Sequence, residues 1–393
     1  MKTISVNKIY YPRKFYQILM TVAFAINTGG QYDHILRFLV YVYIFDWFVM
    51  VVVSPVCVIL EGTVTDLSMI LEQIQYMMVG MFHVLICILF IKKNDAITSN
   101  YNLIRNDFIQ WSEKRGVDPN ETYKKNLRTV KYSMIPIIIV ISCITLGPLF
   151  TAINDIGKLP LDSKPHFVLF WPKIIKIETL KVYGIVYLVQ SIFLVFLYVT
   201  TISVNFGCMV FLSEIMNQFE ILLEGIKNTF NNHKMEKTFK NNFIDCIRHH
   251  QIIIKFLDDF KSYFKWVILI ELVIMQLVLT IIIYSIIKVE ASVLYKVKII
   301  GSFMFNVTPF LFHCHIGEVI LSLHTRLADH VYKMMWYDMP NKNKQLIVIM
   351  FQRTQRDLSL NSAIFSGEKA SRQLISKVIK QVYAFLNVLL KAS

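Results

Sequence analysis

The sequence predicts an all-α, polytopic membrane protein with seven transmembrane helices and an intracellular N-terminus. Of its 393 residues, 55% are hydrophobic and only 17% are charged, whereas soluble domains carry about 25% charged residues. Seven stretches reach or approach the roughly 20 apolar residues that a helix needs to cross a bilayer. Lys and Arg are concentrated in alternate loops between these stretches, which is the pattern of a multi-span protein.

The seven predicted spans follow one another along almost the whole chain. They lie at about residues 35–60, 68–91, 132–151, 183–212, 266–287, 297–321 and 372–390, and the last is the most polar. A shorter apolar segment precedes them at 15–26. Roughly 12 residues cannot cross a bilayer, so an interfacial amphipathic helix is favoured there; a partial span is the alternative.

The distribution of basic residues predicts the orientation. The N-terminal segment and the loops at 92–131, 213–265 and 322–371 hold 29 of the 41 Lys and Arg, whereas the alternate loops and the tail hold eight. Since basic loops stay in the cytoplasm, we expect a cytoplasmic N-terminus, without a cleavable signal peptide, and an extracellular C-terminus. The sequon at Asn120 would then stay unglycosylated. The net charge of +14 fits contact with membrane lipids better than nucleic acid binding.

The spans and loops divide the chain into four regions. Residues 1–34 form a cytoplasmic N-terminal segment with the interfacial helix, and 35–321 hold spans one to six with helical cytoplasmic extensions at 213–265. Residues 322–371 form a cytoplasmic anchor region, and 372–393 form the seventh span and a short extracellular tail. Apolar residues recur at helical spacing in "FLSEIMNQFEILLEGIKNTF" and in "KQLIVIMFQRTQ". These stripes need partners, within one subunit or between subunits.

No motif indicates an enzyme, a cofactor or a metal site. The six cysteines show no CxxC spacing. His313, Cys314 and His315 could suggest a metal, but positions i and i+2 of a helix point to different faces, so packing or hydrogen bonding is favoured. His249 and His250 lie in a charged helical segment, and we expect them to be solvated.

The seventh span has one polar face, because residues 373, 376, 377, 380, 384 and 387 recur at helical spacing. This face indicates a water-filled path, with the apolar residues beyond it as a gate. The alternative is that the basic side chains extend to the membrane surface. The candidate pore and gate residues are Lys380, Tyr383, Leu386, Asn387 and Leu390.

A candidate ligand pocket lies among the outer halves of spans two, three, four and six. Its walls would be aromatic and apolar with a few polar groups, which suits a small, volatile, weakly polar ligand. Plain helix packing is the alternative for each residue. The candidates are Gln73, Tyr76, Met77, Gly80, Ser142, Thr145, Phe150, Tyr187, Ser191, Leu194, Phe303 and Asn306.

The C-terminal third carries an ordered set of landmarks over about 80 residues. They are Cys314 with Gly317-Glu318, Tyr332 and Trp336, Arg353-Thr354-Gln355-Arg356, Ala363 and Phe365, Tyr383-Ala384-Phe385, and Val388-Leu389-Leu390. This set resembles the insect odorant receptor family, and upstream the match is architectural.

The resemblance implies an odorant-binding subunit of a ligand-gated, non-selective cation channel in the plasma membrane of an olfactory sensory neuron. Its partners would be a shared co-receptor subunit, in a heterotetramer, and a small volatile odorant. The last helix would line the pore, although Lys380 is unusual for a cation path. The loop at 213–265 is shorter than that of the co-receptor, which favours a ligand-tuning subunit.

Three alternatives remain. A gustatory receptor-type channel would carry a Thr-Tyr-(five apolar)-Gln-Phe signature, but the stretch from Val382-Tyr383 to Leu389-Leu390 lacks its Thr, Gln and Phe. A G-protein-coupled receptor would have an extracellular N-terminus, and a transporter would show internal repeats.

Overall fold

The structure is a computed structural model that describes residues 67–115, 180–231, 236–289, 293–334, 336–362 and 369–392, together with scattered positions at 38–49 and 128–139. Within these residues the regular structure is helical, apart from one isolated bridge between Asn361 and Lys369. The predicted all-α class is confirmed.

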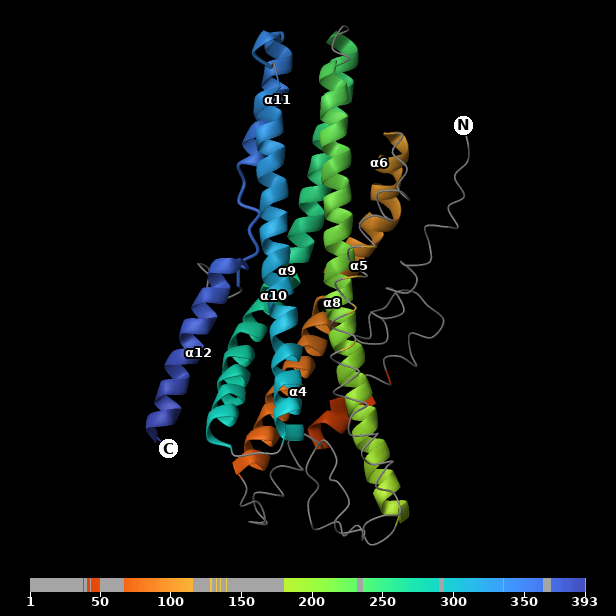
Figure 1. Cartoon of the computed structure of the whole chain (residues 1–393). Coiled ribbons are helices and arrows are strands. Elements are labelled where there is room, and N and C mark those ends of the chain that lie inside the picture. Colours follow the sequence, from red (N-terminus) through yellow and green to blue (C-terminus); the bar gives the residue numbers. More distant parts are fainter. Residues whose placement is uncertain are drawn as a thin grey trace.

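Three long helices form the body of the molecule (Figure 1). They are α8 (Leu180–Asn231), α9 (Glu236–Lys288) and α10 (Val293–Lys333), with 52, 53 and 41 residues. At 1.5 Å per residue they are about 60–80 Å long, whereas the hydrocarbon core of a bilayer is only about 30 Å thick. Each helix therefore continues far beyond the length that a membrane crossing requires.

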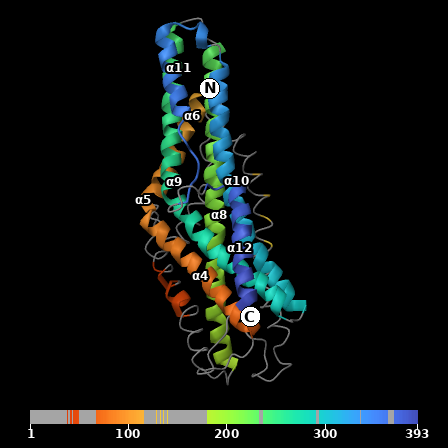
Figure 2. The same cartoon turned by 90° about the vertical axis from the view of Figure 1, so that its left-hand side faces the viewer.

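Helix α9 is the centre of the fold. It packs against α4 (Leu67–Lys92), α5 (Asn94–Asn102), α8, α10, α11 (Asn341–Thr354) and α12 (Arg372–Ala392). A short π-helix, η3 (Leu103–Phe108), and α6 (Ile109–Lys114) continue from α5, and η5 (Trp336–Asp338) joins α10 to α11. Figure 2 shows α5 at one edge of the bundle and α4 crossing the bundle obliquely from there toward the C-terminus. Helix α12 packs against α9 and α10.

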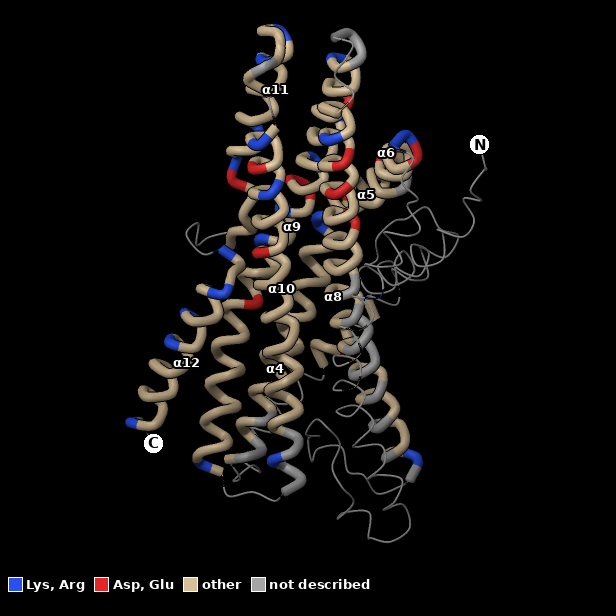
Figure 3. The backbone as a smooth tube through the Cα atoms, turned by 45° about the horizontal axis from the view of Figure 1, so that its top comes forward, with Lys and Arg blue, Asp and Glu red and all other residues tan. Residues whose placement is uncertain are grey.

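The molecule has an apolar half and a charged half (Figure 3). Lys, Arg, Asp and Glu gather around α5, α6, α11 and the adjoining parts of α8, α9 and α10, which we call the charged half. In the other half they are few, apart from a row along α12. This division of one bundle is what a membrane protein with a large water-exposed body requires.

Four helices of the described part are long and apolar enough to cross a membrane by length and composition. The stretches are Gln73–Lys92, Ser203–Asn231, Phe239–Lys288 and Ile299–Lys333. Predicted spans one and three lie mostly outside the described residues, and α12 is long enough but carries several basic residues. Four crossings therefore have direct support, and the total of seven stays a prediction.

Aromatic side chains fill the core where the charged half meets the apolar half. Phe256 packs edge-on against Phe211, and its ring centroid lies 5.3 Å from that of Phe108. Phe260 stacks on Phe264 with 4.8 Å between the ring centroids. All five are essentially inaccessible to solvent. The apolar stripes of 213–265 thus find their partners within the same chain, at least for the described part of those helices.

The prediction that His249 and His250 are solvated is wrong, because both side chains are buried. His249 stacks on Trp111 of α6 at 4.8 Å, and its Nε2 lies 2.8 Å from the Gln218 side-chain oxygen of α8. His250 stacks with His324 of α10. The partners of the two histidines come from three other helices. The local sequence around the histidines is charged and does not indicate these contacts.

Candidate functional site

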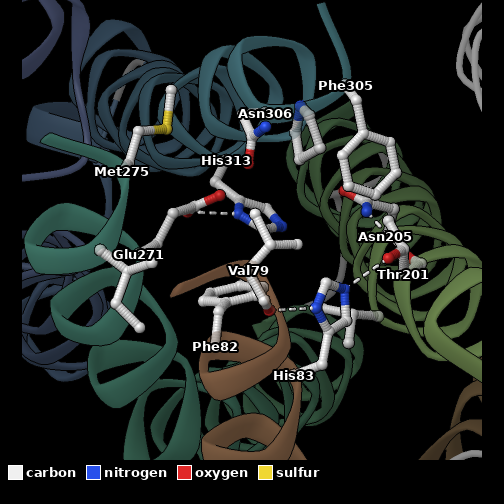
Figure 4. A pocket seen from close by; sticks show the side chains of 13 residues that line it. Val79, Phe82, His83, Thr201, Asn205, Glu271, Met275, Phe305, Asn306 and His313 are labelled. Carbon is white, nitrogen blue, oxygen red and sulfur yellow. Dashed lines mark hydrogen bonds and ion pairs between the residues drawn. The ribbon is translucent and has the colours of Figure 1, made fainter. Parts of the chain in front are cut away.

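A cavity lies within the apolar half, where α4, α8, α9 and α10 meet (Figure 4). Its volume is about 50 Å³, and a single water needs roughly 10–15 Å³ on the same measure. The cavity therefore has room for a few water-sized groups. It is lined by Val79, Phe82, His83, Thr201, Val204, Asn205, Glu271, Ile274, Met275, Phe305, Asn306, Pro309 and His313.

A buried ion pair stands on one side of the cavity. Nδ1 of His313 on α10 lies 2.7 Å from Oε2 of Glu271 on α9, and neither side chain is more than 6% exposed. An ionised carboxylate can only accept a hydrogen bond, so Nδ1 is the donor and Nε2 is the atom left for other partners. Two charged groups in an apolar interior are stable only when they are paired, so this pair holds α9 and α10 together.

A hydrogen-bonded histidine stands on the opposite side of the cavity. His83 on α4 donates from Nδ1 to the carbonyl oxygen of Val79, at 2.7 Å, and its Nε2 lies 2.6 Å from the hydroxyl of Thr201 on α8. Both ring nitrogens therefore have partners within the chain. His83 joins α4 to α8, and its hydrogen-bonding capacity is used up.

Asn205, one turn along α8 from Thr201, has an unused hydrogen-bond acceptor, unlike His83. Its Nδ2 donates to the carbonyl oxygen of Thr201 at 2.8 Å, which fixes the orientation of the amide. Its Oδ1 is buried and makes no hydrogen bond in the structure. Figure 4 shows Asn205 at the cavity wall, across from Glu271 and His313. A buried acceptor of this kind is costly unless something binds to it.

The cavity is connected to α12 through α10. Gly317 lies one turn from His313, and a Cβ at this position would overlap the carbonyl oxygen of Ala370 and come within 2.8 Å of its Cβ. Beside it, Glu318 accepts a hydrogen bond from the backbone N–H of Arg372 at 2.9 Å and pairs with its guanidinium at 3.0 Å. The absence of a side chain at Gly317 therefore lets the start of α12 dock on α10.

Two described stretches, 357–362 and 369–371, meet just before α12. Ala370 donates its N–H to the carbonyl oxygen of Leu360, and Lys369 pairs with Asp357 at 3.0 Å. The backbone N–H of Ser359, with further help from its hydroxyl and from Lys369, lowers the pKa of the Asp357 carboxyl to about 2. Asp357 is therefore charged at neutral pH and ties the two stretches together through Lys369.

The predicted ligand residues are placed unevenly. Asn306 lines the cavity. Tyr76, Met77 and Phe303 are half-buried against the core, Gln73 is half-buried, and Gly80 is buried; those on α4 precede His83 by one to three turns. Ser142, Thr145 and Phe150 lie outside the described residues. Tyr187, Ser191 and Leu194 belong to α8, but their side chains are also outside the described set.

The predicted pore residues lie on different faces of α12. Lys380 and Tyr383 are exposed, and Asn387 and Leu390 are partly exposed. Leu386 is only 8% exposed, on the face that also buries Leu374, Val378 and Val382. In this structure Leu386 packs within the chain, so it does not share the surface that Lys380 and Tyr383 present.

Sequence reasoning missed four polar residues of the cavity: His83, Thr201, Asn205 and Glu271. For His313 it favoured packing or hydrogen bonding over metal binding, but it did not place this residue at a ligand site. One signal was present. Glu271 is the single acidic residue in the apolar run from 266 to 287, and ionisable residues within spans default to function. The position of Asn205 beside the cavity could not be read from α8 alone.

Comparison with known proteins decides the family. The sequence model described as "7tm Odorant receptor" matches residues 66–366, which is more than three quarters of the chain. The chain belongs to the odorant receptor family. Most of the described helices, including all those around the cavity, fall within the matched segment.

Two kinds of relatives accompany this family match. The odorant receptor coreceptors of Aedes aegypti and Aedes albopictus are 19% identical over 145 residues, 37% of this chain and 30% of theirs. The match thus spans less than a third of those proteins. The insect olfactory receptor OR5 from Machilis hrabei has the same fold over 99% of both chains in its complex with eugenol (TM-score 0.78, 12% identity), and over 98% in a second structure.

As a member of this family the chain is a multi-pass membrane protein and not an enzyme. The family match and the shared fold also favour the odorant receptor interpretation over the transporter alternative. Two landmarks of the resemblance have a visible place in the structure. Gly317 and Glu318 hold the start of α12, and Arg353 and Thr354 form the end of α11.

Proposed function

We propose that this odorant receptor is the ligand-binding subunit of a ligand-gated, non-selective cation channel. A small volatile molecule binds in the cavity between α4, α8, α9 and α10, and α12 lines the pore. The cavity with its two buried polar sides carries this proposal. The binding of eugenol by the receptor from Machilis hrabei, which has the same fold, supports it.

The channel assembles with a shared co-receptor subunit. The similarity to the mosquito coreceptors supports a common architecture for the two kinds of subunit. The exposed apolar residues of α12, such as Ile379, Phe385 and Val388, would face neighbouring subunits or lipid. The row of exposed polar residues, including Lys380 and Tyr383, would face the pore, and Asn387 and Leu390 would contribute to the gate.

Two connections carry the effect of the ligand to α12. On α10, His313 is followed one turn later by Gly317 and Glu318, which hold the start of α12. On α9, Glu271 is followed by Gln276, whose amide donates to Gln381 of α12. A ligand that changes the spacing of α9 and α10 would therefore move both contacts, and it shifts the gate by its difference in affinity between the two states.

The deciding experiment is co-expression with the co-receptor in a cell line, with current recorded during application of a panel of volatile molecules. Cells that express the co-receptor alone serve as the control. We expect odorants that evoke current only when both subunits are present. A receptor that reaches the cell surface, yet adds no odorant response to that of the co-receptor, would overturn the proposal.

A further inference from the structure

The side chains around the cavity differ in whether their hydrogen-bonding capacity is used. Both nitrogens of His83 have partners, and one nitrogen of His313 is bonded to Glu271. Oδ1 of Asn205 and Nε2 of His313 are buried without a hydrogen-bond partner. These two buried atoms come from different helices, and both residues line the same cavity.

The Asn205 atom determines which chemistry fits. Its Nδ2 is committed to the carbonyl oxygen of Thr201, so Oδ1 is the free end of the amide, and a carbonyl oxygen can only accept. A ligand must therefore bring an O–H or N–H group to satisfy it. Ketones, esters, ethers and hydrocarbons bring none.

The His313 atom narrows the class further. Its Nε2 donates or accepts according to the charge of the ring, and the thiol of Cys208 on α8, which is close to the ring, is only a weak partner. A hydroxyl that donates its one hydrogen to Asn205 still has oxygen lone pairs, and these can accept from the Nε2–H of His313 when the ring is charged in its pair with Glu271. An ammonium group only donates, and it would add a third charge beside the buried pair of Glu271 and His313.

The remaining residues of the cavity wall determine which non-polar groups the ligand can carry. Phe82, Val204, Ile274, Met275 and Phe305 surround the polar atoms with apolar surface, which would bury a hydrocarbon or aromatic body. The small volume of about 50 Å³ excludes a bulky polar head.

We propose that the ligand is a small, otherwise apolar alcohol or phenol, whose hydroxyl hydrogen-bonds to Asn205 Oδ1 within reach of His313. This inference rests on the proposed function and names the ligand class of that channel. Asn205 is a specificity-determining residue in this account, and the ion pair of Glu271 and His313 positions the imidazole.

The test compares ligands that share one carbon skeleton: an alcohol or phenol, its methyl ether, the corresponding ketone or ester, and the hydrocarbon. Each is applied to cells that express the receptor with the co-receptor. We expect the hydroxylated member to activate at roughly 5- to 100-fold lower concentration than its ether, the ratio expected for a buried acceptor left without its donor. This comparison uses only the wild-type receptor with its co-receptor, so it does not depend on whether a variant folds.

Two variants locate the effect. Asn205→Leu has similar size but no acceptor, and it should remove the preference for the alcohol while the response to the ether persists. Thr308→Val on α10 is the control, because the hydroxyl of Thr308 donates to the carbonyl oxygen of Met304 in its own helix and the residue is not among those that line the cavity. It should keep the wild-type preference.

The outcomes separate this inference from the proposed function. Equal potency of alcohol and ether at a receptor that does conduct would overturn the hydroxyl assignment and leave the channel intact. An alcohol preference that survives Asn205→Leu, with surface labelling at the wild-type level, would remove Asn205 from the site. If no ligand of any class evokes current from the pair of subunits, the proposed function itself fails.

Discussion

At the scale of single residues, the cavity is defined by how its polar atoms are paired. Glu271 and His313 form a contact between α9 and α10. Either charged group alone would be strongly unfavourable in this apolar interior. His83 and Thr201 make a comparable link between α4 and α8, but without a charged partner. One polar contact thus joins α9 to α10 and another joins α4 to α8. Asn205 lies one turn from Thr201 with its Oδ1 unpaired.

Removing one partner of the ion pair should destabilise the folded receptor much more than replacing both partners with apolar residues. We expect Glu271→Ala to destabilise the folded receptor by about 3–5 kcal/mol, since the histidine then has no buried partner. The double variant Glu271→Leu with His313→Leu should recover most of this loss. The measurement is thermal unfolding of purified receptor in detergent.

A single variant that melts like the wild type would show that the pair is solvated. Glu271→Gln is a useful intermediate, because its side-chain oxygen can still accept from Nδ1 of His313. Its stability should lie between those of the wild type and Glu271→Ala.

At the scale of elements, α10 has two roles along its length. Its part around His313 contributes to the cavity, and its part around Gly317 and Glu318 holds the start of α12. One turn separates the two. A rigid helix transmits a displacement over this distance without any additional moving part, which makes α10 the simplest connection between the proposed ligand site and α12, the proposed pore helix.

The docking of α12 on α10 should depend on the missing side chain at Gly317. We expect Gly317→Ala to displace the start of α12, because the new methyl group would overlap the backbone of Ala370. Odorant-evoked current should fall at least tenfold at equal surface expression. Gly184→Ala on α8 is a matched control, since nothing lies within 4 Å of the corresponding Cβ.

The control should be neutral or slightly stabilising, because Ala is favoured over Gly within a helix by about 1 kcal/mol. Equal currents from Gly317→Ala and Gly184→Ala would refute the role of this junction in gating.

The elements were largely predictable, and their partners were not. Helical spacing alone placed α11 and the extensions of α8 and α9, because a helix imposes its period on the sequence. The burial of His249 could not be predicted in this way, because Trp111 and Gln218 reach it from other helices. For the same reason Asn306 was recognised as a cavity residue and Asn205, on a neighbouring helix, was not.

At the scale of the whole molecule, the charged half and the apolar half belong to one continuous bundle (Figure 3). The core does not end where the apolar stretches end, because the aromatic cluster around Phe256 and Phe260 continues it into the charged half. The body outside the membrane is therefore an extension of the spans, with no separate domain in the described part of the chain.

The orientation of this bundle is set by its basic loops. We predict that the charged half lies in the cytoplasm, as the 29 basic residues of the N-terminal segment and alternate loops imply. Asn120 should then carry no glycan, and an epitope tag after Ser393 should be accessible on intact cells. Glycosidase-sensitive mobility and antibody labelling without permeabilisation measure these two properties.

A glycan on Asn120 would invert the assignment. A sequon introduced into the loop at 152–182 provides the positive comparison, because this loop should face the secretory lumen during synthesis.

The free acceptor on Asn205 also bears on how much receptor a cell can maintain. A buried polar atom without a partner weakens the folded state. A molecule that binds only the folded state stabilises it, by an amount that grows with the logarithm of its concentration relative to its Kd. A hydroxylated odorant present during biosynthesis would therefore help newly made chains to survive quality control. Exposure to the ligand would adjust the abundance of its own detector, on a timescale of hours, in addition to opening it within milliseconds.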